Sequence, residues 1–168
     1  AVMRSLKQLG LDSLGLKWPN DIYYQQRKLG GILLEVSGES SGPCHVVVGL
    51  GLNLLLSNKQ AKTINQPWTD LQQISGVAAN LDRNQLLAGL MNEILFVLKD
   101  YTQAGLARYL DEWRSYDVVQ SKTVRLEVGD LVMDAVVDGI DDQGFLRVTD
   151  SQGQPRRFAS GEISMKLS

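Results

Sequence analysis

The sequence predicts an α+β protein in which a mixed or antiparallel sheet with packed helices is followed by a small β-barrel. Three observations support this class. Strand-like runs separated by turn residues fill residues 14–53, helical periodicity follows over residues 82–116, and short alternating segments split by glycine-containing turns occupy residues 121–159. The change of pattern near residue 120 predicts two domains, residues 1–118 and residues 121–168.

The first domain is expected to begin with a helix and continue into three strands. Apolar residues at helical spacing precede Gly10, which predicts a helix over residues 2–9. Residues 14–18 and 28–36 are expected to form one hairpin through an Asn-Asp turn. The β-branched run at residues 45–50 is typical of a central strand that is buried on both faces. Residues 54–69 show no clear period, which predicts a long loop.

Two helices and a run of short strands are expected in the rest of the chain. Asp82 and Gln85 resemble a capping box, and apolar residues at helical spacing follow as far as Tyr101. A shorter amphipathic helix is predicted over residues 105–116. Four strands of a small barrel are expected over residues 123–128, 131–138, 145–149 and 156–159.

Composition excludes several classes of function. The 168 residues carry a formal net charge of −2 and no basic run, which argues against DNA binding by this segment. The single cysteine, Cys44, excludes an intramolecular disulfide and favours a reducing cytoplasm. The single histidine, His45, excludes a multi-histidine metal site. Nothing resembles a signal peptide or a membrane span. Because the chain begins at Ala1 inside the first predicted helix, we expect the natural protein to start upstream.

The segment from Lys17 to Gly31 concentrates the candidate chemistry. An isolated lysine is usually a solvated side chain, but Lys17 and Lys28 are eleven residues apart across one hairpin. This spacing can bring both ammonium groups to the same rim, where they can neutralise a carboxylate and phosphates. Between them, Asn20 and Asp21 either only shape the turn or also bind a ligand.

Glycines mark two places where a ligand can approach the backbone. Gly30 and Gly31 follow Lys28 directly and lack a Cβ. The segment from Gly49 through Gly51 and Leu52 to Asn53 lacks the third glycine of a dinucleotide fingerprint, so a Rossmann site is excluded. It still predicts a strand end open to a ligand, with an asparagine that can donate and accept hydrogen bonds to a nucleotide. Trp68 either packs in the core or caps a bound ring.

Taken together, the strings Lys17 to Asp21, Arg27 to Leu33 and Gly49 to Asn53 resemble the biotin protein ligases. These enzymes biotinylate the carrier subunit of acetyl-CoA carboxylase. The resemblance covers nearly the whole chain and implies part of a class II synthetase-like ligase domain followed by an SH3-like barrel. The implied reaction uses biotin and MgATP to form biotinyl-AMP, which a lysine of the biotin carboxyl carrier protein then attacks.

The resemblance also implies a role for each candidate residue. Lys28 would be the catalytic residue that contacts the biotin carboxylate and the α-phosphate. Lys17 would lie near the triphosphate, and Asn20 and Asp21 near the nucleotide and its Mg²⁺, with no metal site built from the protein alone. The remaining substrate and nucleotide contacts would come from Gly30, Gly31, Gly49, Gly51, Leu52, Asn53 and, in the loop that covers the adenylate, Trp68.

One departure and two alternatives accompany the resemblance. The Gly-Arg-Gly-Arg loop of the family is absent from these residues, so the segment alone is expected to be inactive. The resemblance also implies a homodimer through a sheet edge, with residues 37–43 as a candidate contact. It leaves open whether the full-length protein carries an upstream repressor domain. The alternatives are a lipoate ligase of the same fold and a non-enzymatic dimerisation or regulatory module.

Overall fold

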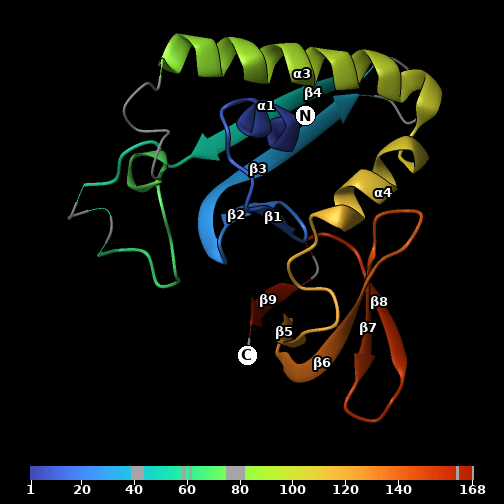
Figure 1. The fold of residues 1–168 in the computed structure, drawn as a ribbon. Coiled ribbons are helices and arrows are strands. Elements are labelled where there is room, and N and C mark those ends of the chain that lie inside the picture. Colours follow the sequence, from blue (N-terminus) through green and yellow to red (C-terminus); the bar gives the residue numbers. More distant parts are fainter. Residues whose placement is uncertain (39–43, 58–59, 61, 75–81, 162, 168) are drawn as a thin grey trace.

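Two antiparallel sheets and a layer of helices make up the structure (Figure 1). The computed structural model describes residues 1–38, 44–57, 60, 62–74, 82–161 and 163–167. The first sheet has four strands in the order β1-β2-β3-β4, and the second has five in the order β8-β7-β6-β5-β9. The predicted α+β class, with antiparallel sheets and few helices, is therefore confirmed.

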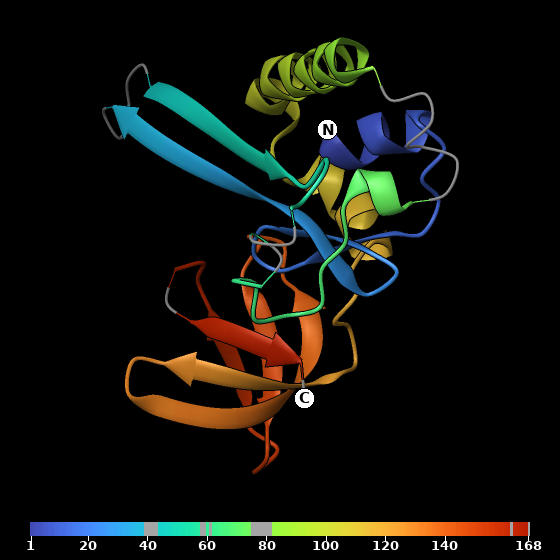
Figure 2. The ribbon, with the colours of Figure 1, turned by 90° about the vertical axis from the view of Figure 1, so that its left-hand side faces the viewer.

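The first sheet is formed by β1 (Leu14–Lys17), β2 (Asp21–Tyr24), β3 (Arg27–Gly38) and β4 (Cys44–Leu52). Strands β3 and β4 pair along nine residue positions, from Gly30 opposite Leu52 to Gly38 opposite Cys44. Figure 2 shows this hairpin as a long arm that extends away from the second sheet.

The predicted hairpin between residues 14–18 and 28–36 is wrong because β2 lies between these strands. Two residues connect β2 to β3, and both of them, Gln25 and Gln26, have positive φ angles of 45° and 64°. Two positive φ angles are the mark of a type I′ turn, which normally uses Asn-Gly or Asp-Gly. The Gln-Gln pair lacks that signal, so the extra strand was not recognised from the sequence.

The prediction that residues 45–50 form a central strand is also wrong for this chain. Strand β4 is an edge strand, since β3 is the strand that pairs with it in the described part of the chain. Val46 is 39% exposed and Val47 is 59% exposed. The apolar pattern was read correctly, but nothing in the described residues covers both faces of the strand.

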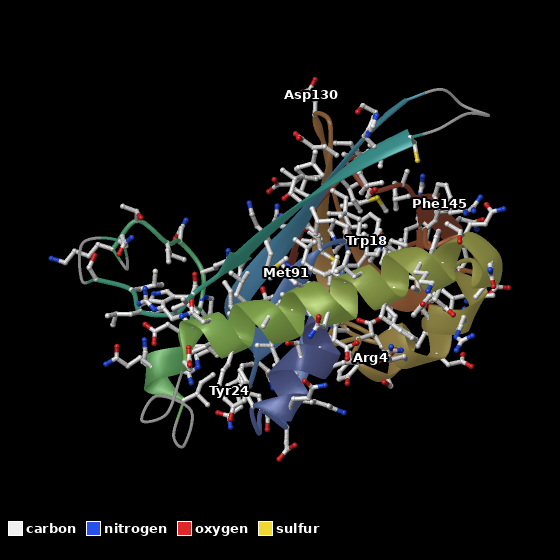
Figure 3. All side chains as sticks on the ribbon, turned by 90° about the horizontal axis from the view of Figure 1, so that it is seen from above. Arg4, Trp18, Tyr24, Met91, Asp130 and Phe145 are labelled. Carbon is white, nitrogen blue, oxygen red and sulfur yellow. The ribbon has the colours of Figure 1, made fainter. Side chains whose placement is uncertain are left out.

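Among the described residues, the helices α1, α3 and α4 and one 3₁₀ turn complete the first part of the fold. Helices α1 (Val2–Gln8) and α3 (Arg83–Ala104) lie over the arm, and α4 (Ala107–Ser115) descends towards the second sheet (Figures 1 and 3). As the sequence predicted, Asp82 caps α3, where its carboxylate accepts hydrogen bonds from the backbone of Asn84 and Gln85. Turn η1 spans Leu71–Gln73. None of the helices in the described residues has the length and hydropathy needed to cross a membrane.

One apolar core joins α1, α3 and η1 to the first sheet. Leu6 on α1, Ile22 on β2, Leu29 on β3 and Leu71 on η1 are fully buried there. They contact Leu86 and Leu90, the buried residues of α3. The helices therefore pack against one face of β2 and β3, and this packing fixes the positions of the ends of these strands.

The second sheet is formed by β5 (Thr123–Val128), β6 (Leu131–Ile140), β7 (Leu146–Asp150), β8 (Pro155–Phe158) and β9 (Ser164–Leu167). The four predicted strands are present with small shifts of their ends. Strand β9 was not predicted, because its four residues carry little periodicity of their own. It pairs with β5 and places Met165 in the core of this sheet.

A bidentate ion pair links the first helix to α4. Arg4 Nε and Nη2 donate to the two carboxylate oxygens of Glu112, at 2.8 and 2.5 Å. The hydrogen bonds from Arg4 lower the pKa of Glu112 below its usual value. A carboxyl group whose pKa is lower in the folded state stabilises the fold above its unfolded pKa, and this contribution is lost as the pH falls through its folded pKa.

We therefore predict that Glu112→Gln lowers the free energy of unfolding at neutral pH, and that the deficit shrinks as the pH falls below about 4, near the unfolded pKa of a glutamate. Urea unfolding between pH 3 and pH 7 measures this. Asp111→Asn, which removes a fully exposed carboxylate on the same helix, is the control and should cause little change. A Glu112→Gln deficit that is equally large at pH 3 would contradict the prediction.

Candidate functional site

The charged residues of the candidate site meet where β1, β2 and β3 come together. The register places Lys17 opposite Asp21, and Asp21 opposite Gly31. The pairing of β2 with β3 shifts after Ile22, so that Lys28 falls opposite Tyr23. This irregularity turns the Lys28 side chain towards Asp21, and its Nζ lies 2.6 Å from Asp21 Oδ1. Both side chains are partly buried, with 28% and 19% of their surface exposed.

Lys17, the second lysine, lies on β1 opposite Asp21. Lys17 Nζ donates a hydrogen bond to the backbone carbonyl of Met165 at 2.7 Å. Burial lowers the pKa of Lys17, Asp21 acts against this shift, and the positive charge of Lys28 adds to it. Two ammonium groups and one carboxylate therefore share one corner of the first sheet, which leaves an excess of one positive charge among these three side chains.

The β1–β2 turn is held by its own asparagine. The Asn20 side-chain amide donates to the carbonyl of Ile32 at 2.7 Å, and the backbone nitrogen of Ile32 donates to the Asn20 carbonyl at 2.9 Å. The Trp18–Pro19 peptide bond in this turn is cis. In this arrangement Asn20 connects the turn to β3, and its side chain remains exposed beside Asp21.

Glycines on facing strands create the floor of the site. A Cβ on Gly30 would lie 2.4 Å from the carbonyl oxygen of Gly51, so the two backbones approach too closely for any side chain. On the other face of the strands, Gly31, Gly49 and Gly51 line a cavity of about 380 Å³ together with Lys28 and Asp21. The absence of side chains keeps that floor open beside the Lys28 ammonium.

A second cavity of about 380 Å³ adjoins the first and is bounded by Trp68. It shares Lys28, Gly31 and Gly51 with the first cavity and continues to Leu52 and Asn53. The segment that carries Trp68 is tied to β3, because the backbone nitrogen of Lys28 donates to Pro67 and that of Thr69 donates to Lys28, both at 2.9 Å. Trp68 thus lies half-buried at the edge of a ligand-sized space.

Asn53 has a structural contact that the sequence did not reveal. Its side-chain nitrogen donates to the carbonyl of Thr69 at 3.0 Å.

Asp70 is buried, with 2% of its surface exposed, and it fixes the backbone on both sides of the Trp68 segment. Its two carboxylate oxygens accept hydrogen bonds from the backbone nitrogens of Leu56 and Gln73, at 2.9 Å each. Asp70 was not predicted as a site residue, although an aspartate immediately before a short helical turn is a typical cap signal.

A third and larger cavity, of about 710 Å³, lies between the two sheets. The β1–β2 turn and β3 form one wall, and the other wall is formed by Ser160, Gly161, Ile163, Ser164 and Met165. Lys17, Asn20 and Asp21 line it, so both the carboxylate and the second lysine face this space. The sequence did not predict this wall, because none of its described residues is charged and they carry no motif typical of a ligand site.

The arrangement is suited to binding an anionic ligand. Flexible ammonium groups next to an open backbone floor can neutralise carboxylate or phosphate oxygens. Within the described ranges, no three His, Cys, Asp or Glu side chains come together as a metal-binding group. Of the predicted dimer contact at residues 37–43, residues 39–43 lie outside the described part of the chain.

Two family models match the sequence. The Biotin/lipoate A/B protein ligase family matches residues 1–53, and the Biotin protein ligase C terminal domain matches residues 122–166. The bifunctional ligase/repressor BirA of Escherichia coli is 38% identical over 161 residues, which cover 96% of this chain and 49% of that protein. The biotin--[acetyl-CoA-carboxylase] ligase of Mycobacterium tuberculosis is 32% identical over 150 residues, which cover 89% of this chain and 52% of that protein.

Solved structures show the same fold. The apo biotin protein ligase of Aquifex aeolicus matches 99% of this chain and 71% of its own, with a TM-score of 0.81 and 24% identity. The same protein in complex with biotin and ATP gives a TM-score of 0.80, with 99% of this chain and 68% of that chain covered. The present chain spans about half the length of the curated relatives it matches.

The glycine floor generates a stability prediction with an internal control. Gly30→Ala should lower the free energy of unfolding by about 1–3 kcal/mol, because its Cβ would collide with the Gly51 carbonyl and force the strands apart. Gly51→Ala should change it by less than about 0.5 kcal/mol, since the nearest atom to its Cβ is 3.9 Å away. Chemical denaturation compares the two, and equal effects would show that the close approach of β3 and β4 is not the constraint.

Proposed function

The chain belongs to the biotin protein ligase family, and we propose that it supplies part of the site at which the full-length enzyme activates biotin with ATP. The same site would transfer biotin to a lysine of the biotin carboxyl carrier protein of acetyl-CoA carboxylase. The observation that carries the proposal is the Lys28 ammonium, which is held at 2.6 Å by Asp21 above a floor of glycines.

Lys28 suits the first half-reaction because two anions must meet there. A biotin carboxylate oxygen would attack the α-phosphorus of ATP, and the bond to pyrophosphate would break to give biotinyl-AMP. An ammonium between the carboxylate and the α-phosphate reduces their repulsion and stabilises the charge that develops during the transfer. The first cavity, with Gly31, Gly49 and Gly51 beside Lys28, is the proposed place of the carboxylate.

The second cavity supports the nucleotide side of the proposal. Leu52, Asn53 and Trp68 line it next to Gly30 and Gly51. An aromatic side chain at the edge of such a cavity can stack on a purine ring, and we assign the adenosine to this space. Lys17 would then face the triphosphate, where its positive charge is complementary.

Magnesium fits the same corner without a protein cage. Mg²⁺ usually keeps several waters and uses one or two carboxylates together with phosphate oxygens. Asp21 offers a carboxylate of this kind, with one of its oxygens already paired to Lys28. When bound with the nucleotide, the ion would neutralise phosphate charge, while Lys17 and Lys28 position the phosphate and carboxylate oxygens.

In the second half-reaction a neutral lysine amine of the carrier would attack the carbonyl carbon of the mixed anhydride. The new amide bond forms, the bond to AMP breaks, and the amine loses a proton. Lys17 and Lys28 would both assist by stabilising the departing phosphate. Trp68 and its segment would limit the access of water to the anhydride.

The exposed apolar surface supports the proposal that this segment is inactive alone. Leu33, Leu34 and Val36 on the arm are 58–67% exposed, and Leu95 and Phe96 on α3 are 60% and 51% exposed. Apolar patches of this kind are normally covered by another part of a protein or by a partner. We propose that the rest of the full-length ligase covers them and contributes the Gly-Arg-Gly-Arg loop.

The alternatives carry less support. A lipoate ligase is compatible with the match over residues 1–53, but the match over residues 122–166 is to a biotin protein ligase domain. A non-enzymatic regulatory module would not require the glycine floor beside Lys28. A homodimer through the arm and a cytoplasmic location remain predictions, and a repressor role would depend on residues outside this segment because its net charge is −2.

The test is biotin-dependent exchange of pyrophosphate into ATP, with lipoic acid as the control acid. We expect exchange with biotin in the full-length protein and none in the present segment. Lys28→Ala in the full-length protein should reduce exchange by about a hundredfold or more, the usual cost of removing one stabilising donor. Lys99→Ala, which removes an exposed lysine on α3, is the matched control.

Each other result has a definite meaning. Exchange with lipoic acid in place of biotin would support the lipoate ligase. No exchange with either acid would support the regulatory module. Retained exchange in Lys28→Ala would show that the catalytic role assigned to Lys28 is wrong.

A further inference from the structure

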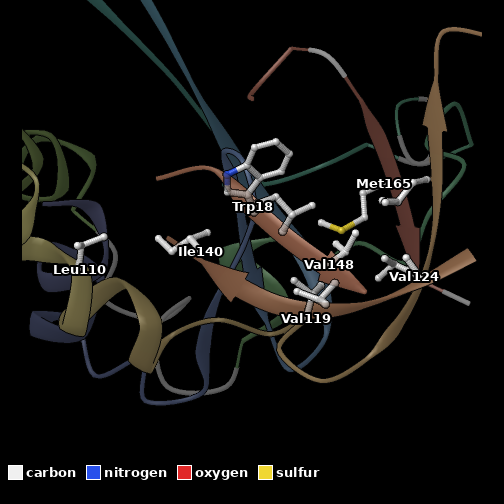
Figure 4. Packing of buried hydrophobic residues seen from close by; sticks show 11 residues of the cluster. Trp18, Leu110, Val119, Val124, Ile140, Val148 and Met165 are labelled. Carbon is white, nitrogen blue, oxygen red and sulfur yellow. The ribbon is translucent and has the colours of Figure 1, made fainter. Parts of the chain in front are cut away.

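The indole of Trp18 belongs to the core of the second sheet although it follows a strand of the first. Trp18 is 5% exposed and packs in the same apolar cluster as Val119, Val148 and Met165 (Figure 4). Its indole nitrogen donates to the carbonyl of Gly144 at 3.0 Å. The core of the second sheet, which we call the barrel, is thus completed by a residue of the β1–β2 turn, directly beside Lys17.

Lys17 itself is held by the second sheet. Its acceptor at 2.7 Å is the Met165 carbonyl, a backbone atom of β9. Lys17 also lines the 710 Å³ cavity between the sheets together with Asp21. Its ammonium is therefore restrained from the side of the barrel and remains next to a space that a ligand can enter.

Further contacts keep the barrel in one position relative to β1. The backbone nitrogen of Leu16 donates to Tyr116 at 2.7 Å, and that of Val118 donates to Leu16 at 2.9 Å. From α4, Arg114 donates to the Ile140 carbonyl at 3.3 Å and to Asp142 at 2.9 Å. Because these contacts surround the Trp18 anchor, a shift of the barrel must also shift β1 and the start of the turn.

We propose that Trp18 is a positioning residue of the site, because its indole, fixed in the barrel core, keeps Lys17 where the β9 carbonyl of Met165 holds its ammonium beside Asp21. The proposal rests on the proposed function. A role in stability alone does not account for Lys17, because partial burial of an ammonium costs free energy that an apolar side chain at this position would avoid. The lowered pKa of Lys17 reflects this cost.

A double-mutant cycle in the full-length protein tests the coupling. The variants are Lys17→Met, Trp18→Leu and their combination, and the readout is the KM for MgATP in biotin-dependent exchange. Lys17→Met should raise this KM by about tenfold, the worth of one charge-assisted hydrogen bond. Trp18→Leu should raise it by a similar factor, and the double variant should be no worse than the worse single variant.

Two further variants separate positioning from stability. Trp18→Phe keeps most of the packing and loses the hydrogen bond to Gly144, so its KM should lie between those of the parent and Trp18→Leu.

Phe158→Leu is the control for stability, because it perturbs the same apolar cluster from β8. It should lower the thermal unfolding temperature while leaving the KM within about twofold, since a surface or core change away from a site rarely alters binding. The proposal would be overturned if the rise of KM in the double variant equalled the product of the rises in Lys17→Met and Trp18→Leu. It would also be overturned if Phe158→Leu raised the KM as much as Trp18→Leu does.

A structural measurement on the 168-residue chain is independent of enzymatic activity. The pH titration of the Lys17 ¹³Cε resonance, assigned by its loss in Lys17→Met, reports the environment of this ammonium among Met165, Asp21 and Lys28. In Trp18→Leu the titration should move up towards the ordinary lysine value of about 10.4, and in Phe158→Leu it should stay in place. An unchanged titration in a folded Trp18→Leu variant would overturn the positioning role. If the full-length protein shows no exchange, the proposed function fails, and this titration alone decides the positioning role.

Discussion

The burial of the Trp18 indole in the barrel core is the contact on which the relation between the two sheets depends. Trp18 follows β1 directly, yet its ring completes the cluster formed by the second sheet and by Leu110 of α4. Burying an aromatic ring of this size is one of the larger single contributions available to such a core. Because the neighbours of Trp18 in sequence are Lys17 and the turn with Asn20 and Asp21, the same contact also places the charged part of the candidate site.

The candidate site places charged side chains beside a backbone surface made of glycines, and β3 contributes to both. The close approach of Gly30 to the Gly51 carbonyl draws β3 and β4 together, and the side-chain-free face that results lies beside Lys28. Asp21 holds Lys28 over that face, while the Met165 carbonyl of β9 holds Lys17, which lies opposite Asp21 in the β1–β2 register. The charged groups all come from the first sheet, and the second sheet contributes the Met165 carbonyl that accepts a hydrogen bond from Lys17.

The apolar composition of β4 does not match its position at the edge of the first sheet. Residues 45–50 carry the composition of a strand buried on both faces, and this composition led to the prediction of a central strand. In the described structure β4 is an edge strand with Val46 and Val47 exposed. Composition predicts how apolar the surroundings of a strand should be, whereas its position in the sheet depends on which other strands pair with it.

Local patterns in the sequence determined most elements of the fold and the identity of the charged candidates. Helical periodicity and the Asp82 cap predicted α3, alternation predicted four barrel strands, and the spacing of Lys17 and Lys28 predicted a shared rim. Only the tertiary structure decided the extra strand β2, the bulge that turns Lys28 to Asp21, and the hold of Met165 on Lys17. These features arise from a Gln-Gln turn, a register shift and a backbone carbonyl 148 residues away, and such contacts depend on chain geometry, which local side-chain patterns do not encode.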